Sequence, residues 1–200
     1  MKILILFFMV VSLHASTQEA LQAYKDKEYT KAFALYSEAA KKGNAEAQNA
    51  LSYLYFNGIG TSQDQQQGFM WLKKAADSND TRACFDLGMM YLMGVHTQKD
   101  LQKAAKYLQI ASNKGNLEAT YNLALMYYRG DGVKQDVNKA ASLLDKAAKA
   151  GHSGARRNVG RVYMQALNFK KAKEWLRVNA QEGDVEAAQL LKEIEAAKKD

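Results

Sequence analysis

Few side chains in this 200-residue sequence have a spacing that enzyme chemistry requires. His14, His96 and His152 lie far apart, and none has a second ligand at the spacing of a metal site. The single cysteine, Cys84, has no histidine placed to activate it as a nucleophile. The Ser-x-x-Lys pair of serine β-lactamases does not occur. The sequence therefore predicts no catalytic residue, no metal site and no cofactor.

A glycine-rich segment also fails the tests for a ligand-binding loop. Gly130-Asp131-Gly132 lacks the preceding strand and the following pattern of a phosphate loop. Asp131 and Asp136 supply only part of the oxygen-ligand series that calcium requires. We interpret the glycines as a turn and Asp136 as the N-cap of a helix. The carboxylate of Asp136 would accept hydrogen bonds from the free backbone N–H groups at the start of that helix.

One short motif predicts a modification. Asn79-Asp80-Thr81 is an Asn-x-Thr sequence, and Asp77 stands two residues before the asparagine. The pattern resembles the extended acceptor of bacterial periplasmic oligosaccharyltransferases, which makes Asn79 a candidate N-glycosylation site. The alternative is a chance match, because Asn and Asp favour junctions between helices in any case.

The elements that would position such residues recur every 36 residues. Segments 44–79, 80–115 and 116–151 align, with the same residue at four positions of each: Ala47, Ala83 and Ala119; Leu51, Leu87 and Leu123; Tyr55, Tyr91 and Tyr127; Gly58, Gly94 and Gly130. A period of this length is typical of stacked units that bury their apolar faces only against one another.

Each unit contains two apolar runs with helical spacing, so the sequence predicts an all-α fold. In the third unit, Ala119, Leu123 and Tyr127 mark the first run, and Leu144 and Ala148 the second. Gly115, Gly151 and Gly183 are expected to end the second helices, and Asn44, Asp80, Asn116 and Asp184 to open the next ones. Segments 16–43 and 152–183 read as tighter hairpins, and 184–200 as a C-terminal capping helix.

The motif with Gly130-Asp131-Gly132-Val133, Asp136, Lys139-Ala140 and Lys146-Ala147-Ala148 resembles the Sel1-like repeat, a relative of the tetratricopeptide repeat. The resemblance implies a right-handed α-solenoid that serves as a non-catalytic adaptor between proteins. Some exported bacterial relatives carry a penicillin-binding or β-lactamase label, which gives β-lactam binding or hydrolysis as an alternative function. This chain lacks the paired cysteines of those relatives.

The N-terminal segment 1–15 predicts export. Lys2 precedes the apolar run 3–13, and polar residues follow Ala15, as in a cleaved secretory signal peptide. The run is too short for a membrane anchor, so no stable span is expected after cleavage, and the predicted location is periplasmic or secreted. Cys84 is then the only thiol and is expected to be a small buried core residue, with a reactive thiol as the alternative.

If the units pack as tetratricopeptide repeats do, their first helices line a concave face. The corresponding positions predict an apolar and aromatic partner-binding surface with a basic end, made of Tyr53, Phe56, Phe85, Met89, Tyr121, Leu125, Tyr128, Arg157 and Arg161. Such a surface suits a protein or peptide partner with apolar anchors and an acidic end. The alternative is that these side chains are core.

The net charge of +7 is concentrated towards the C-terminal end. Residues 152–177 contain Arg156, Arg157, Arg161, Lys170, Lys171, Lys173 and Arg177 against the single acid Glu174. In an exported protein this favours an acidic protein surface, an acidic cell-wall polymer or anionic lipid over nucleic acid. Binding to the cell envelope through this basic end is therefore a second alternative function, and a plain solvated face is the simplest explanation.

Overall fold

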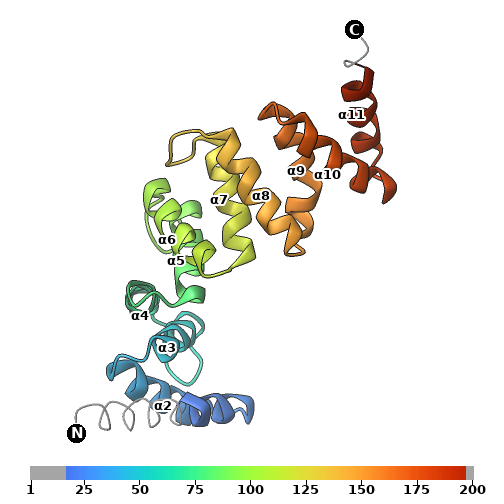
Figure 1. Cartoon of the computed structure of the whole chain (residues 1–200). Coiled ribbons are helices and arrows are strands. Elements are labelled where there is room, and N and C mark those ends of the chain that lie inside the picture. Colours follow the sequence, from blue (N-terminus) through green and yellow to red (C-terminus); the bar gives the residue numbers. More distant parts are fainter. Residues whose placement is uncertain (1–16, 197–200) are drawn as a thin grey trace, which may run out of the picture. The chain divides into compact units, whose positions relative to one another are not determined.

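The structure of the protein is a computed structural model that describes residues 17–196 (Figure 1). Within that range every regular element is helical, as the sequence predicts. Residues 17–25 are helical, and ten labelled helices follow: α2 (Tyr29–Lys41), α3 (Ala45–Asn57), α4 (Gln65–Asp77), α5 (Thr81–Met93), α6 (Leu101–Asn113), α7 (Leu117–Arg129), α8 (Val137–Lys149), α9 (Ser153–Gln165), α10 (Phe169–Gln181) and α11 (Val185–Ala196).

The chain divides into two compact units, one ending at Lys99 and the other beginning at Asp100. In the first unit α2 to α5 pack each against the next, and in the second unit α6 to α11 do the same. Small and apolar residues at the repeat positions fill each core. The first core contains Leu51, Leu54 and Trp71, and the second contains Leu144, Val159 and Leu176.

Polar caps begin the helices where the sequence predicts them. Asn44, Asp80 and Asn116 accept the backbone N–H of the residue three positions later at 2.7–2.8 Å. Asp136 accepts the N–H of Lys139 at 2.8 Å, which confirms it as an N-cap. The cap of α9 is a histidine instead: His152 Nδ1 accepts the N–H of Ala155 at 3.0 Å.

Left-handed residues end the helices and shape the long loops. Gly115, Gly151 and Gly183 follow the second helices with φ of 89–95°, as expected for residues that end a helix. In the long loops a Cβ at Gly60 would overlap the carbonyl of Tyr29, and a Cβ at Gly132 would overlap that of Leu101. Only glycine allows a loop to lie this close to the first turn of the preceding second helix.

Two predictions made for other parts of the chain have different outcomes. Cys84 is buried, as predicted, and its Sγ donates to the carbonyl of Ala76 at 3.4 Å. The signal peptide predicted at residues 1–15 lies outside the described residues. Between residues 17 and 196, no helix combines the length and the apolar character that crossing a bilayer would require.

Candidate functional site

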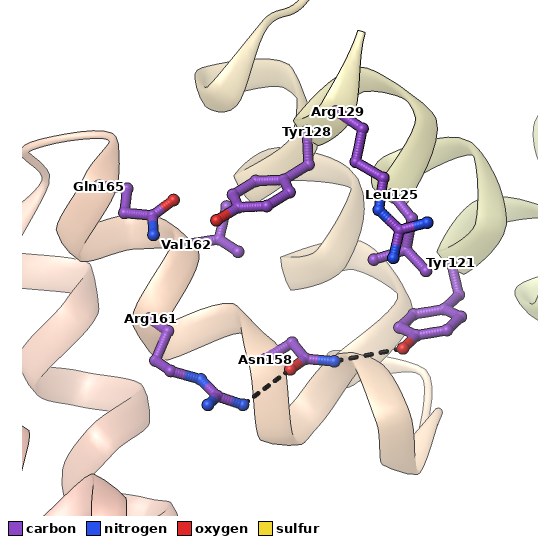
Figure 2. Close-up of a pocket in the computed structure, with 8 residues that line it drawn as sticks. All are labelled: Tyr121, Leu125, Tyr128, Arg129, Asn158, Arg161, Val162 and Gln165. Carbon is purple, nitrogen blue, oxygen red and sulfur yellow. Dashed lines mark hydrogen bonds between the residues drawn. The ribbon is translucent and has the colours of Figure 1, made fainter. Parts of the chain in front are cut away.

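The second unit contains a cavity of about 430 Å³ between α7 and α9, which we call the α7/α9 pocket (Figure 2). One face of each helix lines it. From α7 come Tyr121, Leu125, Tyr128 and Arg129, and from α9 come Asn158, Arg161, Val162 and Gln165. These residues recur at helical spacings of three, four or one, so the two faces follow from the sequence once the helices are adjacent.

Tyr121 is held in place by three neighbours. Its ring stacks on that of His152, with centroids 4.5 Å apart, and its hydroxyl accepts a hydrogen bond from Asn158 Nδ2 at 3.2 Å. A Cβ added at Gly154 would lie only 3.3 Å from Tyr121 Cζ, so the glycine leaves space for the ring. The phenol is therefore fixed before any ligand arrives, which lowers the entropy cost of binding.

The charge of this pocket is positive. Arg129 and Arg161 contribute guanidinium groups, and no carboxylate is among the lining residues. Arg161 donates to Asn158 Oδ1 at 2.9 Å and forms an ion pair with Glu186 at 2.7 Å. Figure 2 shows its guanidinium directed towards Asn158. Oriented guanidinium and phenol groups suit a ligand with a carboxylate or phosphate.

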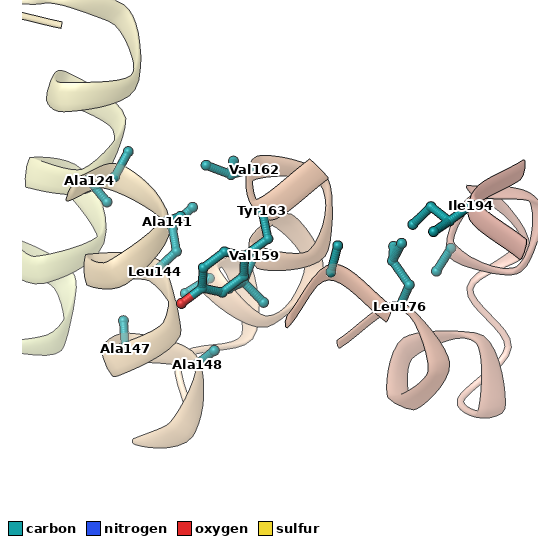
Figure 3. Packing of buried hydrophobic residues seen from close by; sticks show 14 residues of the cluster. Ala124, Ala141, Leu144, Ala147, Ala148, Val159, Val162, Tyr163, Leu176 and Ile194 are labelled. Atoms are coloured by element: carbon teal, nitrogen blue, oxygen red, sulfur yellow. The ribbon is translucent and has the colours of Figure 1, made fainter. Parts of the chain in front are cut away.

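The floor of the α7/α9 pocket is the core of the second unit (Figure 3). Val162 belongs to both, with only 8% of its surface exposed. Tyr121 and Tyr128 are half-buried and pack against the same cluster. Val162, Tyr121 and Tyr128 are thus held by packing, whereas Arg129, Arg161 and Gln165 are exposed at the mouth of the pocket.

The first unit contains a second cavity of about 330 Å³, the α3/α5 pocket, and its lining is mainly apolar. Its residues come from α3, from Leu72 of α4, from α5 and from the loop after α5: Asn49, Ser52, Tyr53, Phe56, Asn57, Leu72, Asp86, Met89, Met90, Met93, Val95 and His96. Burial raises the pKa of the Asp86 carboxyl, and the guanidinium of Arg82, 3.3 Å away, opposes that rise.

The predicted partner-binding residues are divided between the two pockets. Tyr53, Phe56 and Met89 line the α3/α5 pocket, and Tyr121, Leu125, Tyr128 and Arg161 line the α7/α9 pocket. Phe85 and Arg157 line neither of these two.

Several lining residues of the α7/α9 pocket were not predicted from the sequence. Arg129 lies eight residues after Tyr121, so it continues the same helical face and was detectable by extending that face by one position. Asn158 and Gln165 depend on how α9 packs, and the sequence alone holds no signal for them.

Asn79 occupies the left-handed position that ends α4, with φ 60°. The equivalent residue in the other units is glycine, and asparagine is the next most frequent residue there. Its side chain is exposed, and its backbone N–H donates to the carbonyl of Ala76 at 2.8 Å. The helix junction explains an asparagine at this position, and its glycosylation stays a prediction.

The described range holds no cluster of three or more His, Cys, Asp and Glu side chains that would bind a metal ion. What it does contain is a series of helical hairpins in tandem with two lined cavities, which is the architecture of an α-solenoid repeat protein.

The chain belongs to the Sel1 repeat family: the family model matches residues 23–44, 45–80, 81–116 and 117–152. Proteins of this family generally act as scaffolds for protein interactions.

Solved structures agree with the family. A protective antigen present in uropathogenic Escherichia coli strains, which displays an SLR fold, is similar with a TM-score of 0.78 and 26% identity, over 90% of this chain and 40% of that one. A Sel1 repeat protein from Oxalobacter formigenes gives 0.69 and 29%, over 91% of this chain and 78% of that one. This chain therefore spans less than half the length of the E. coli protein. A search of curated proteins finds no match.

Proposed function

We propose that this protein is an exported, non-catalytic adaptor that binds an acidic segment of a partner protein in the α7/α9 pocket. The observation that carries the proposal is the lining of that pocket: two phenols and two guanidinium groups with no carboxylate among them. A peptide with an apolar side chain next to an aspartate, a glutamate or a C-terminal carboxylate matches it. The apolar group would pack on Leu125 and Val162, and the anion would pair with Arg129 and Arg161.

Pre-organisation supports the same proposal. Tyr121 and Arg161 are already held by Asn158, so a ligand would not need to order either side chain. Glu186 pairs with Arg161 and would compete with an incoming carboxylate. The pocket would then exchange an internal ion pair for an intermolecular one, which favours selectivity for strongly acidic segments over high affinity.

The test uses the full mature chain and fluorescein-labelled peptides in anisotropy titrations. One peptide set carries an apolar residue beside paired aspartates, and a matched set carries asparagines instead. We expect binding of the acidic set only, about 10- to 150-fold weaker in Arg129→Gln and in Arg161→Gln, since loss of one charged hydrogen bond is worth about 1.5–3 kcal/mol. Arg157→Gln is the matched control, because Arg157 is an exposed arginine of α9 outside the pocket lining.

A further variant tests the ion-pair exchange. Glu186→Gln removes the internal ion-pair partner of Arg161, so we expect it to increase the affinity for the acidic peptides. Equal binding of acidic and amidated peptides, or equal weakening by the Arg157→Gln control, would remove the basis of this proposal. The double variant Tyr121→Ala/Tyr128→Ala, if folded, must also lose the interaction.

Export rests on the apolar run 3–13 after Lys2, and comparison of the N-terminus of the mature protein with the gene product tests it. The envelope alternative relied on Arg156, Arg157 and Arg161. Arg156 pairs with Glu182 and Arg161 with Glu186, so part of that positive charge is already compensated. The adaptor proposal also uses Arg161, but it rests in addition on Arg129 and on the phenols of Tyr121 and Tyr128.

A further inference from the structure

One loop position of the first unit carries a histidine where the other two long loops have a glycine. His96 has φ 57°, and the residues 36 positions before and after it are Gly60 and Gly132. Those glycines have no Cβ because the carbonyls of Tyr29 and Leu101 lie against them. By the same period, the carbonyl that would face His96 belongs to Gln65. A residue with a Cβ could not lie as close to that carbonyl as Gly60 and Gly132 lie to theirs.

A left-handed backbone at a residue with a side chain costs about 1–2 kcal/mol, and such strain is concentrated at functional sites. The side chain of His96 shows what the strained conformation positions. Its ring stacks on Phe56, with centroids 4.9 Å apart and planes at 27°. Phe56 is itself fixed, because its ring packs where a Cβ on Gly68 would otherwise be. Among the described residues the imidazole has no hydrogen-bond partner, so its nitrogens are free to bind a ligand.

Three methionines of α5 line the same α3/α5 pocket as His96. Met89 and Met93 are four residues apart, and Met90 and Met93 three apart, so their side chains lie on neighbouring positions of one helical face. Gly94 turns the chain immediately after Met93, in a left-handed conformation with φ 73°, and His96 follows two residues later. Four soft or borderline donors, three thioether sulfurs and one imidazole, therefore border a single cavity of about 330 Å³.

The equivalent positions of the other repeats show that packing does not require a methionine at position 93. Met93 is 59% exposed, and its counterparts are the polar residues Asn57 and Arg129. Leu54 and Met126, the counterparts of Met90, are buried, whereas Met90 is half-buried and lines the pocket. The sulfur-bearing side chains are thus most exposed in the one repeat that also carries the strained histidine.

From this combination we propose that the α3/α5 pocket binds one soft monovalent metal ion, Cu(I), through Met90, Met93 and His96, with Met89 as a further thioether donor. Thioether sulfur is a soft ligand that suits Cu(I), imidazole suits copper and zinc alike, and magnesium and calcium prefer oxygen ligands. All four donors are neutral, so the bound ion keeps its charge. Asp86 lines the same pocket, where its carboxylate is already paired with Arg82 at 3.3 Å. The proposal is independent of the proposed function, whose pocket lies in the other unit.

The test is an anaerobic competition experiment in which the folded mature chain removes Cu(I) from its bicinchoninate complex. The wild type is expected to take up one Cu(I) per chain. Met90→Leu/Met93→Leu keeps the volume and apolar character but removes two sulfurs, and His96→Gly restores the glycine of the other repeats. Each change is expected to weaken Cu(I) at least about tenfold, since losing even the residues that support a metal ligand costs 10–100-fold. Met70→Leu, on α4 and outside this pocket, is the control and keeps full uptake.

The ε-methyl NMR signals of methionine, recorded with Ag(I) as a redox-inert probe, locate the ion. We expect the signals of Met90 and Met93 to shift on titration, and that of Met164 on α9 to remain unchanged. Failure of the wild type to take up Cu(I), uptake that survives the double leucine change, or uptake unaffected by His96→Gly would each overturn the site. His96→Gly is expected to raise the thermal stability, so loss of uptake in that variant cannot be ascribed to unfolding.

Discussion

The imidazole of His152 lies 3.1 Å from Glu118 Oε1 through its Nε2, and it has two further contacts that the asparagine of other repeats would not combine. It caps α9 through Ala155 and stacks on Tyr121 of the α7/α9 pocket. His152→Asn is expected to keep the cap, because Asn44 and Asn116 cap equivalent helices, but to release the Tyr121 ring. Stability should therefore be retained while the affinity for acidic peptides falls.

The companion variant His152→Ala separates the two contacts further. It removes the cap as well, and is expected to lower the free energy of unfolding by about 1 kcal/mol. Urea denaturation and peptide anisotropy on the same samples give both values. If His152→Asn binds acidic peptides as tightly as the wild type, the stack does not contribute to recognition.

Leu167, like His96, has a left-handed backbone with φ 57°, and it is 75% exposed at the turn between α9 and α10. Leu167→Gly is expected to stabilise the protein by about 0.5–1 kcal/mol, since relief of the left-handed strain exceeds the added entropy of the unfolded chain. Leu167→Ala removes the same exposed side chain but keeps a Cβ, so its urea midpoint should match the wild type. A stabilisation as large in the alanine variant would assign the effect to lost apolar surface instead.

Between elements, α10 is tied to α8 by a charged hydrogen bond. Trp175 Nε1 donates to Asp145 Oδ1 at 2.8 Å, and Lys149 pairs with the other carboxylate oxygen at 2.8 Å. Burial alone would raise the pKa of Asp145, but these two hydrogen bonds outweigh it and hold the pKa below its ordinary value of 3.8. The bond therefore stabilises the fold above that pH and is lost as pH falls through the lowered pKa.

Trp175→Phe should then lower the free energy of unfolding by about 2 kcal/mol at pH 7. The loss should become progressively smaller below pH 3.8, because the carboxyl becomes protonated. Urea midpoints at both ends of this pH range measure the difference. Trp71→Phe is the control, since the Trp71 indole donates no hydrogen bond within the described part of the chain. An equal pH dependence in both variants would exclude the Asp145 bond as its cause.

The close approach of the long loop to a helix can be tested in the second unit. Gly132→Ala places a Cβ against the carbonyl of Leu101 and is expected to cost about 3 kcal/mol or more, because backbone must move. Gly151→Ala has a similar positive φ but nothing within 4 Å of the new Cβ, so its cost should be only the left-handed strain of about 1–2 kcal/mol. Similar losses in the two variants would show that the loop moves freely.

The features of the fold that could be predicted from the sequence were the local ones. Asp136 and Gly115 were recognised because a cap or a left-handed turn depends on a few neighbouring residues. His152 was not, because histidine is rarely an N-cap and its role appears only with Ala155 and Tyr121 in place. The pockets bring together residues that are far apart in the sequence, such as Tyr121 and Asn158, which are 37 positions apart. Which side chains of two helices contact each other depends on how the helices pack, and the repeat period does not determine it.

At the scale of the whole molecule, each compact unit has its own core and its own tryptophan, Trp71 in the first and Trp175 in the second. Repeat proteins gain stability mainly from contacts between neighbouring hairpins, so a local defect acts most strongly on its own unit. In a Trp71→Phe background, Leu144→Ala should lower the free energy of unfolding reported by Trp175 fluorescence by the 2–5 kcal/mol typical of such a core truncation.

The same Leu144→Ala change in a Trp175→Phe background should move the Trp71 midpoint much less. Leu72→Ala, in the first unit, should show the reverse preference. Fluorescence-monitored urea titrations of the four combinations give the comparison. Coincident shifts for both reporters would mean that the chain unfolds as one cooperative body.

The thiol of Cys84 is the only one in the chain and is completely buried between α4 and α5, with the carbonyl of Ala76 as its acceptor. A water-soluble disulfide reagent can reach it only when these helices separate. The rate of thiol labelling under native conditions therefore measures how often the first unit opens, and it needs neither an engineered probe nor a denaturant. Leu72 of α4 and Met90 of α5 both line the α3/α5 pocket. A ligand bound there would therefore lower the labelling rate of the thiol in proportion to its occupancy.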